Sequence, residues 1–267
     1  MLIDIGANLT HPSFAHDVSA VVARAIAAGV GQIILTGTTV AISQQALALA
    51  RSLAPAHPAC LFTTAGIHPH HAVDFDPAAD AALRALLQEP EVRAVGETGL
   101  DYNRDFSPRP RQRQAFEAQL AIAVVVGKPL FLHERDAHDD FVGILDSFSA
   151  RTAPVVVHCF SGTKAELFAY LDRDCFIGIT GWVCDERRGQ GLRELVRHIP
   201  ANRLLVETDA PFLLPHTVRP RPADPRRNEP MYLPQVVETL ARERGEPVSV
   251  TAENSTTAAR VFFGLAG

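Results

Sequence analysis

The alternation of short apolar runs with longer amphipathic segments limits the possible folds of this chain more than any other feature. Eight such runs are present, at residues 2–8, 31–37, 60–66, 92–96, 129–133, 154–158, 175–180 and 203–208. They are apolar on both faces, as parallel strands covered by helices on both sides must be. Segments with helical spacing lie between them, at residues 14–28, 39–53, 76–87, 107–126, 136–148, 162–171 and 189–198, and two more follow at 233–244 and 251–263.

This pattern predicts an α/β fold with a parallel sheet, and the number of runs favours a closed (β/α)8 TIM barrel. We expect one barrel domain over residues 1–267. The alternative is an open, doubly wound sheet. Such a sheet normally has a glycine-rich phosphate loop after its first strand, and Gly6-Ala7-Asn8-Leu9 is not one.

Composition excludes several classes of protein. The net charge of -5 and the pI near 6.1 argue against a strong, sequence-independent grip on duplex nucleic acid. The four cysteines form no CxxC pair and indicate reduced thiols. The N-terminus does not resemble a signal peptide, and no apolar segment is long enough to span a bilayer. We therefore expect a cytoplasmic protein without a membrane partner.

Four of the apolar runs deliver a metal-type ligand at or just beyond their C-terminal end. These residues are Glu97, His133, His158 and Asp209. Because the C-terminal ends of barrel strands converge at one mouth, the four side chains should meet there. Hydrolases hold divalent metals with histidine nitrogens and carboxylate oxygens, which leaves a position open for water. Any one of them is equally compatible with a hydrogen-bonded histidine or a solvated acid, but four at equivalent positions favour a metal centre.

Two further acids lie beside these ligands. Glu207 and Asp209 are two residues apart, so on a strand they face the same way. We predict that Asp209 binds metal and is the catalytic residue that takes a proton from the attacking water. Glu207 is predicted to contact substrate or to support the ligands, with a structural role at the strand end as the alternative. Asp101 is either a partner of Glu97 or a cap of its loop.

The third loop, IHPHH, contains a histidine cluster. His68 and His70 are predicted to contact substrate or phosphate, or to hold a second metal, whereas His71 is expected at the surface. Trp182, after the seventh run, either lines the mouth or covers the barrel end.

Arginines are concentrated in two loops. Arg219, Arg226 and Arg227 lie in the proline-rich segment 215–230, and residues 104–113 hold four more. Runs of charged residues more often form a solvated surface than a binding site. Beside a hydrolytic site, however, these arginines favour binding of the phosphates of an incoming strand.

Several motifs together resemble the TatD family of metal-dependent deoxyribonucleases. They are IGANLT, TAGIHPHH, AVGETGLDYNR, HERDAH, VHCFSGT, GITGWVCDERRG, LLVETDAPFLLP and RRNEP, and they extend over nearly the whole chain. The resemblance implies a (β/α)8 barrel, Mg²⁺-type dependence and 3′→5′ exonuclease action on single-stranded DNA, with RNA as a further substrate, in DNA repair or nucleic-acid turnover. By motif, Glu97, His133 and His158 would be metal ligands, Asp209 the catalytic acid and a further ligand, and His68 a site residue.

The chain departs from the family pattern at two places. Many members carry His-x-His at the end of the first strand, where this chain has Asn8 and Thr10. We therefore expect one tightly bound metal, with a second bound weakly or only with substrate. Mg²⁺ is the expected ion, and Mn²⁺ or Zn²⁺ would also fit the donors. Glu134 replaces the small residue common in relatives, and strand alternation should point it away from the metal. A monomer is expected.

Two other functions use the same features. One is an amidohydrolase or an aminoacyl-tRNA deacylase on the same barrel, because fold does not fix function. The arginine-rich rim argues against a small neutral substrate. The other is a binding protein that has lost catalysis, suggested by the missing His-x-His, and the joint presence of the four ligands argues against it.

Overall fold

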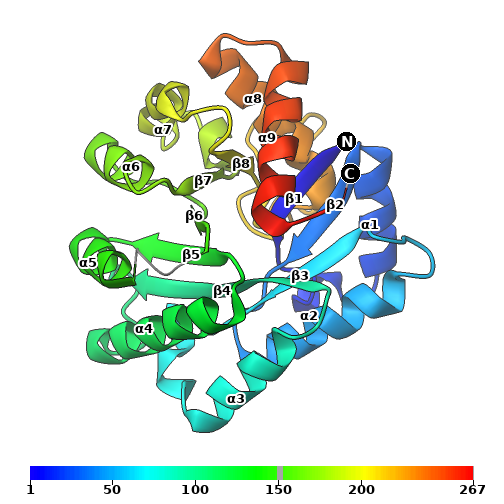
Figure 1. The fold of residues 1–267 in the computed structure, drawn as a ribbon. Helices are drawn as coiled ribbons and strands as arrows, with labels where there is room; N and C mark the ends of the chain where they lie inside the picture. Colours follow the sequence, from blue (N-terminus) through cyan, green and yellow to red (C-terminus); the bar gives the residue numbers. More distant parts are fainter. Residues whose placement is uncertain (149–152, 267) are drawn as a thin grey trace.

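The computed structural model describes residues 1–148 and 153–266. Its eight strands pair in parallel, each with the next along the chain, which confirms the predicted barrel (Figure 1). The strands are β1 (Leu2–Ala7), β2 (Val30–Leu35), β3 (Leu61–Ala65), β4 (Val92–Asp101), β5 (Leu130–Arg135), β6 (Val155–Val157), β7 (Phe176–Ile179) and β8 (Leu204–Val206).

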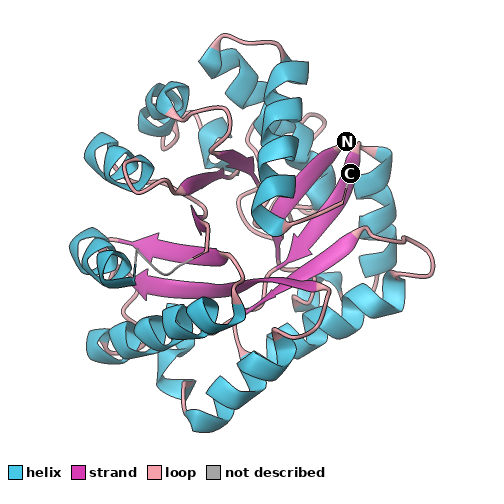
Figure 2. Ribbon diagram, viewed as in Figure 1, coloured by secondary structure: helices cyan, strands magenta, loops and turns pink. Residues whose placement is uncertain are grey.

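Helices surround this sheet on its outer side (Figure 2). They are α1 (Val18–Ala27), α2 (Val40–Leu53), α3 (Pro77–Leu86), α4 (Arg109–Val126), α5 (His138–Phe148), α6 (Lys164–Leu171), α7 (Gln190–Leu195), α8 (Leu233–Arg244) and α9 (Val248–Phe263). Among the described residues, no helix is both long and apolar enough to cross a membrane.

The barrel closes where the chain leaves β1 and β8. Asn8 donates its backbone N–H to the Ala210 carbonyl over 2.7 Å, and Asp209 donates its own to the Gly6 carbonyl over 2.8 Å. A parallel bridge joins Ala7 to Ala210. This seam places Asn8 beside Asp209, although 201 residues separate them.

Apolar side chains fill the interior and the N-terminal end of the barrel. Ile3, Ile5 and Phe131 form an inner cluster with residues of α9. Phe262 of α9 packs edge-on against Phe176 of β7, with ring centroids 5.1 Å apart. In Figure 1, α9 lies beside β1, close to both chain termini. The helix therefore closes this end, and the opposite end remains as the mouth.

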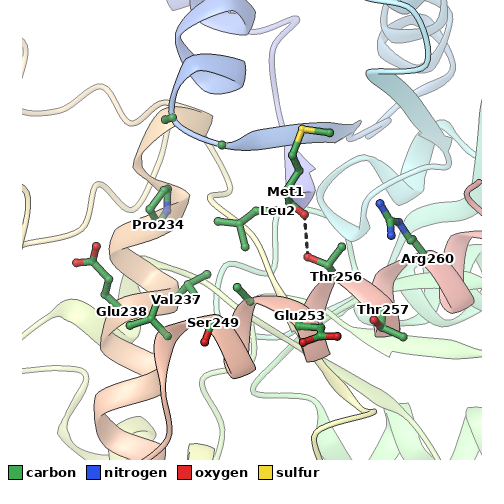
Figure 3. Close-up of a pocket in the computed structure, with 14 residues that line it drawn as sticks. Met1, Leu2, Pro234, Val237, Glu238, Ser249, Glu253, Thr256, Thr257 and Arg260 are labelled. Carbon is green, nitrogen blue, oxygen red and sulfur yellow. Dashed lines mark hydrogen bonds between the residues drawn. The ribbon is translucent and has the colours of Figure 1, made fainter. Parts of the chain in front are cut away.

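A cavity of about 660 Å³ lies at the closed end, between the N-terminus, α8 and α9 (Figure 3). Met1, Leu2, Val237 and Val248 contribute to its lining. Thr256 donates a hydrogen bond from its hydroxyl to the Met1 carbonyl across 3.1 Å.

The largest difference from the expected elements is in β4. The predicted strand ends at residue 96, whereas β4 continues to Asp101, so Glu97 lies within the strand. Gly96 and Gly99 have φ of +146° and +142°, which side chains rarely adopt. A Cβ at these glycines would lie 2.2 Å from the Phe131 carbonyl oxygen and 1.9 Å from that of His133. The missing side chains therefore let β4 approach β5 and bring Glu97 to His133.

Smaller differences concern helix boundaries. The predicted helix 14–28 begins only at Val18, after a short 3₁₀ turn at Pro12–Phe14. The IHPHH loop continues into a 3₁₀ helix, Pro69–Asp74. Helix α9 begins three residues before the predicted start at 251.

Candidate metal centre

One carboxylate oxygen, Oε1 of Glu97, lies at the centre of a histidine cluster. His158 Nε2 is 2.8 Å from it, His133 Nδ1 is 3.1 Å away, and His68 Nε2 is 3.2 Å away. These side chains come from β4, β5 and the ends of β6 and β3. The structure thus brings together three of the residues predicted as ligands, Glu97, His133 and His158, and their role as ligands stays a prediction.

His68 joins this cluster. We expected it to contact substrate or phosphate, or to hold a second metal, and it shares with Glu97 and His133 a group of donor atoms that all lie within 4.8 Å of one another. Its Nδ1 accepts the backbone N–H of His70 at the start of the 3₁₀ helix, over 3.1 Å. This cap orients the ring so that Nε2 faces Glu97.

Asp101 supports the outer side of the cluster. Its Oδ2 accepts from His70 Nε2 over 2.7 Å and lies 3.3 Å from His133 Nε2. Its Oδ1 accepts the backbone N–H groups of Asn103 and Arg104. Asp101 is therefore both a partner of the histidines and the cap of its own loop, the two roles between which the sequence did not decide.

Opposite charges stabilise one another in this buried cluster. Burial acts to raise the pKa of Glu97, but the neighbouring imidazoles hold it well below the usual range. Burial acts to lower the pKa of His158, but Glu97 and Glu207 raise it well above normal. His68 differs, because burial outweighs its attraction to Glu97 and lowers its pKa to about 4. The carboxylate and the imidazoles are thus electrostatically coupled around one oxygen atom.

Asp209 lies on the β8 side of the same cavity. Asn8 Nδ2 donates to its Oδ1 over 3.0 Å, and burial raises the pKa of Asp209 to about 8. The residue that replaces a family histidine therefore holds Asp209 through its amide N–H.

A residue that the sequence reasoning missed, Asn228, holds the loop on either side of Asp209. It is fully buried, and its Nδ2 donates to the carbonyls of Thr208 and Phe212 over 2.9 and 2.7 Å. The only signal for Asn228 is its place in the RRNEP motif.

Glu207 lies behind the histidines and not in the cavity. It is fully buried, accepts the backbone N–H of Cys159 over 2.6 Å, and lies 3.3 Å from His158 Nδ1. These contacts fit the supporting role considered for it. The predicted substrate contact is therefore corrected, because the residue has no exposed surface.

The arginines of segment 215–230 have different surroundings. Arg227 donates to Asp17 over 2.7 Å, and its guanidinium stacks over Phe14, so it is held in a structural ion pair, and its phosphate contact stays a prediction. Arg219 donates to the carbonyls of His216 and Val218 in its own loop, and its substrate contact stays a prediction. The Arg226 side chain is 93% exposed and borders a second cavity.

The donors suit a divalent metal. The cavity has a volume of about 510 Å³ and is lined by Glu97, Asp209 and the histidines. His133 Nε2 is buried and makes no well-formed hydrogen bond among the described residues, although Asp101 Oδ2 lies 3.3 Å away. Imidazole nitrogens beside carboxylate oxygens match the ligands of hydrolytic metal sites.

Glu134 points away from the candidate metal centre, as predicted, and accepts a hydrogen bond from the Tyr170 hydroxyl over 2.9 Å.

Comparison with known proteins adds a second line of support. The family described as TatD related DNase matches residues 3–264. The chain is 50% identical over 262 residues to a Salmonella typhimurium protein named 3′-5′ ssDNA/RNA exonuclease TatD, with 98% of each covered. It is 49% identical to a protein of the same name from Erwinia tasmaniensis, over 99% of this chain and 100% of the relative. The solved structure of the Escherichia coli TatD homologue YJJV gives a TM-score of 0.85 at 29% identity, over 99% of this chain and 98% of that chain.

Proposed function

The chain belongs to the family of TatD-related DNases, and on that premise we propose that it is a metal-dependent 3′→5′ exonuclease acting on single-stranded DNA and RNA. The observation that carries this proposal is the convergence of three imidazoles on Glu97 at the barrel mouth, with Asp209 in the same cavity. An attacking water and a phosphodiester would both be within reach of these groups there.

Glu97, His133, His158 and His68 would hold the metal, with Asp209 as a further ligand, and we propose Mg²⁺ or Mn²⁺ as the ion. When bound, a divalent ion polarises a phosphoryl oxygen and lowers the pKa of water. Glu207 orients His158 from behind, and Asp101 orients His133 and His70. The ligand side chains are therefore held before substrate arrives.

Asp209 is proposed to accept the proton of the attacking water. Burial raises its pKa to about 8, so its carboxylate takes up a proton more readily than that of an exposed aspartate. Asn8 fixes the carboxylate on one side, and the contacts of Asn228 fix the surrounding backbone. His70, which also lines the cavity, is proposed to contact the phosphate.

Other parts of the proposal rest on the sequence. We propose that the protein is a monomer with a single barrel domain and that it acts in the cytoplasm, in DNA repair or nucleic-acid turnover. We also propose that it binds one metal ion tightly and a second more weakly.

The test is incubation of 5′-labelled single-stranded DNA with the protein and Mg²⁺, with and without a chelator. We expect stepwise loss of 3′ nucleotides that the chelator abolishes. His158→Ala should be inactive, and His16→Ala, an exposed histidine outside the site, should be as active as the wild type. Absence of metal-dependent shortening would refute the nuclease proposal, and full activity of His158→Ala would refute the ligand assignment.

A further inference from the structure

A basic and aromatic surface beside the metal centre has no role so far. Trp182 and Arg188, on the segment after β7, both line two adjoining cavities of about 260 and 620 Å³. The Arg188 guanidinium lies over the Trp182 ring, 5.5 Å from its centroid. A flat ring with a guanidinium beside it is a surface that stacks a base and pairs a phosphate.

The charges around both cavities are mainly positive. Arg135 and Lys164 join Arg188 in the larger one, and Arg221 and Arg226 join it in the smaller. Each cavity has a single acid, Glu194 in the larger and Asp185 in the smaller. Asp185 already accepts the backbone N–H groups of Arg187 and Arg188. The chain as a whole is acidic, so this surface is a local exception suited to an anion.

Consecutive residues of the chain link this surface to the metal cavity. Phe212, 49% exposed, lines the metal cavity, and the next residues, Leu213 and Leu214, line the smaller basic cavity. The Leu213 carbonyl oxygen lies only 2.1 Å from where a Cβ of residue 181 would be, so Gly181 lets the two loops touch. On the other side, Arg135 follows His133 by two residues and donates to Ser161 over 2.6 Å.

We propose that Trp182 and Arg188 form the binding site for the nucleotides that precede the 3′-terminal one. The terminal nucleotide occupies the metal cavity beside Phe212. The next base stacks on Trp182, and Arg188 and Arg226 pair with the intervening phosphates. A duplex end does not present unstacked bases, so this site selects single strands. The inference rests on the proposed nuclease function.

Trp182 is the only tryptophan in the chain, so its fluorescence reports this site directly. The probe is a phosphorothioate (dT)8, which resists hydrolysis, titrated with Mg²⁺ present. We expect saturable quenching, and a roughly tenfold weaker affinity for Arg188→Ala. Arg187→Ala removes the same charge one residue away, outside both cavities, and should bind as the wild type does. Unchanged fluorescence while a labelled strand binds by anisotropy would overturn the proposal, as would equal weakening by both variants.

Hydrolysis separates this inference from the function on which it rests. Trp182→Ala and Arg188→Ala should lower kcat/KM for (dT)8 roughly 5- to 100-fold and leave that for thymidine 5′-(p-nitrophenyl phosphate), which has no preceding nucleotide, nearly unchanged. Trp182→Phe keeps an aromatic ring and should retain most of the activity. If the wild type cleaves both substrates and the variants lose both equally, the binding site is wrong. If the wild type cleaves neither, the nuclease function itself fails.

Discussion

The two ends of the barrel contain cavities of comparable size, about 660 Å³ at the closed end and about 510 Å³ at the mouth, but their chemistry differs. The closed-end cavity is lined by Met1, Leu2 and valines of α8 and α9, and also by Glu238, Glu253 and Arg260 (Figure 3). Among the described residues, these charged side chains belong to no cluster of three metal-type donors. The mouth is lined by histidines and two buried carboxylates. Cavity volume alone would identify the wrong end of the barrel as the functional site. The donor atoms at the C-terminal ends of the strands identify the site.

A single strand shows how this difference arises. In β5, Phe131 belongs to the apolar interior, and His133, two residues further on, faces the same side at the mouth. The sequence thus changes from packing to chemistry along one face of one strand. Substitutions at the mouth should therefore remove activity, and those at the closed end should remove stability.

The largest expected effect is at the mouth. Glu97→Gln should lower kcat/KM by roughly 10³-fold and abolish tight metal binding, because Glu97 is the centre of the ligand cluster. Activity assays and titration with Mn²⁺ measure the two losses. Glu134→Gln, on the neighbouring strand but pointing to Tyr170, is the matched control and should remain active. Loss of activity with normal metal affinity would make Glu97 a base instead of a ligand.

Phe262→Ala at the closed end should have the opposite profile. The side chain is 3% exposed and packs against Phe176, so its removal should lower the free energy of unfolding by about 3–5 kcal/mol. Urea denaturation measures this change, and kcat/KM per folded molecule should stay at the wild-type value. A large fall in kcat/KM of the folded protein would show that the two ends are coupled.

Asn8→Ala should distinguish a positioning role of Asn8 from a metal-ligand role. It removes the hydrogen bond to Asp209, and hydrogen bonds to charged groups contribute about 1.5–3 kcal/mol, so kcat should fall roughly 10- to 100-fold. Metal affinity should change little if Asn8 positions Asp209 and is not a ligand. A parallel loss of metal in the Mn²⁺ titration would restore Asn8 as a ligand.

The last substitution concerns Asp4, in the seam below the mouth, and its effect should be smallest at low pH. Burial raises its pKa from 3.8 to about 7, so the folded state prefers the protonated carboxyl. This contribution to stability is present below about pH 4 and is lost as the pH rises through 7. Asp4→Asn mimics the neutral acid and keeps hydrogen-bond partners for the backbone N–H groups of Gly6 and Thr208 and for the Thr208 hydroxyl.

At pH 4, Asp4→Asn should therefore change the free energy of unfolding by less than about 1 kcal/mol. As the pH rises toward 8, the free energy of unfolding of the variant should increase relative to that of the wild type. The increase should be about 1.4 kcal/mol for each unit of the pKa shift that is titrated. Thermal or urea unfolding from pH 4 to 8 measures the difference. A constant difference across this range would mean that Asp4 does not titrate as described.

Much of this architecture could be predicted from the residues alone. The eight strands follow from local apolar patterning, and the barrel then places Glu97, His133 and His158 together. The inward position of His68 could not be predicted, because it depends on a cap within the 3₁₀ helix and on Gln119 of α4, which accepts the Ile67 N–H over 2.7 Å. Loop conformation depends on such distant contacts.

Arg227 shows that the role of a charged residue is equally hard to predict from the sequence. Its loop is rich in arginine and therefore indicated a phosphate-binding rim. The fold pairs Arg227 with Asp17, 210 residues earlier, and with Glu229. A long-range ion pair of this kind leaves no local signal in the sequence. The neighbouring Arg226 lies 4.0 Å from Asp224 within its own loop, and its side chain is 93% exposed.

The most direct test of the account is the position of the bound metal, found by anomalous diffraction from crystals soaked in Mn²⁺. We predict that the strongest peak lies at the mouth, bound by Glu97 and at least two of His68, His133 and His158. A strongest peak elsewhere, or one at the mouth without Glu97 among its ligands, would contradict it.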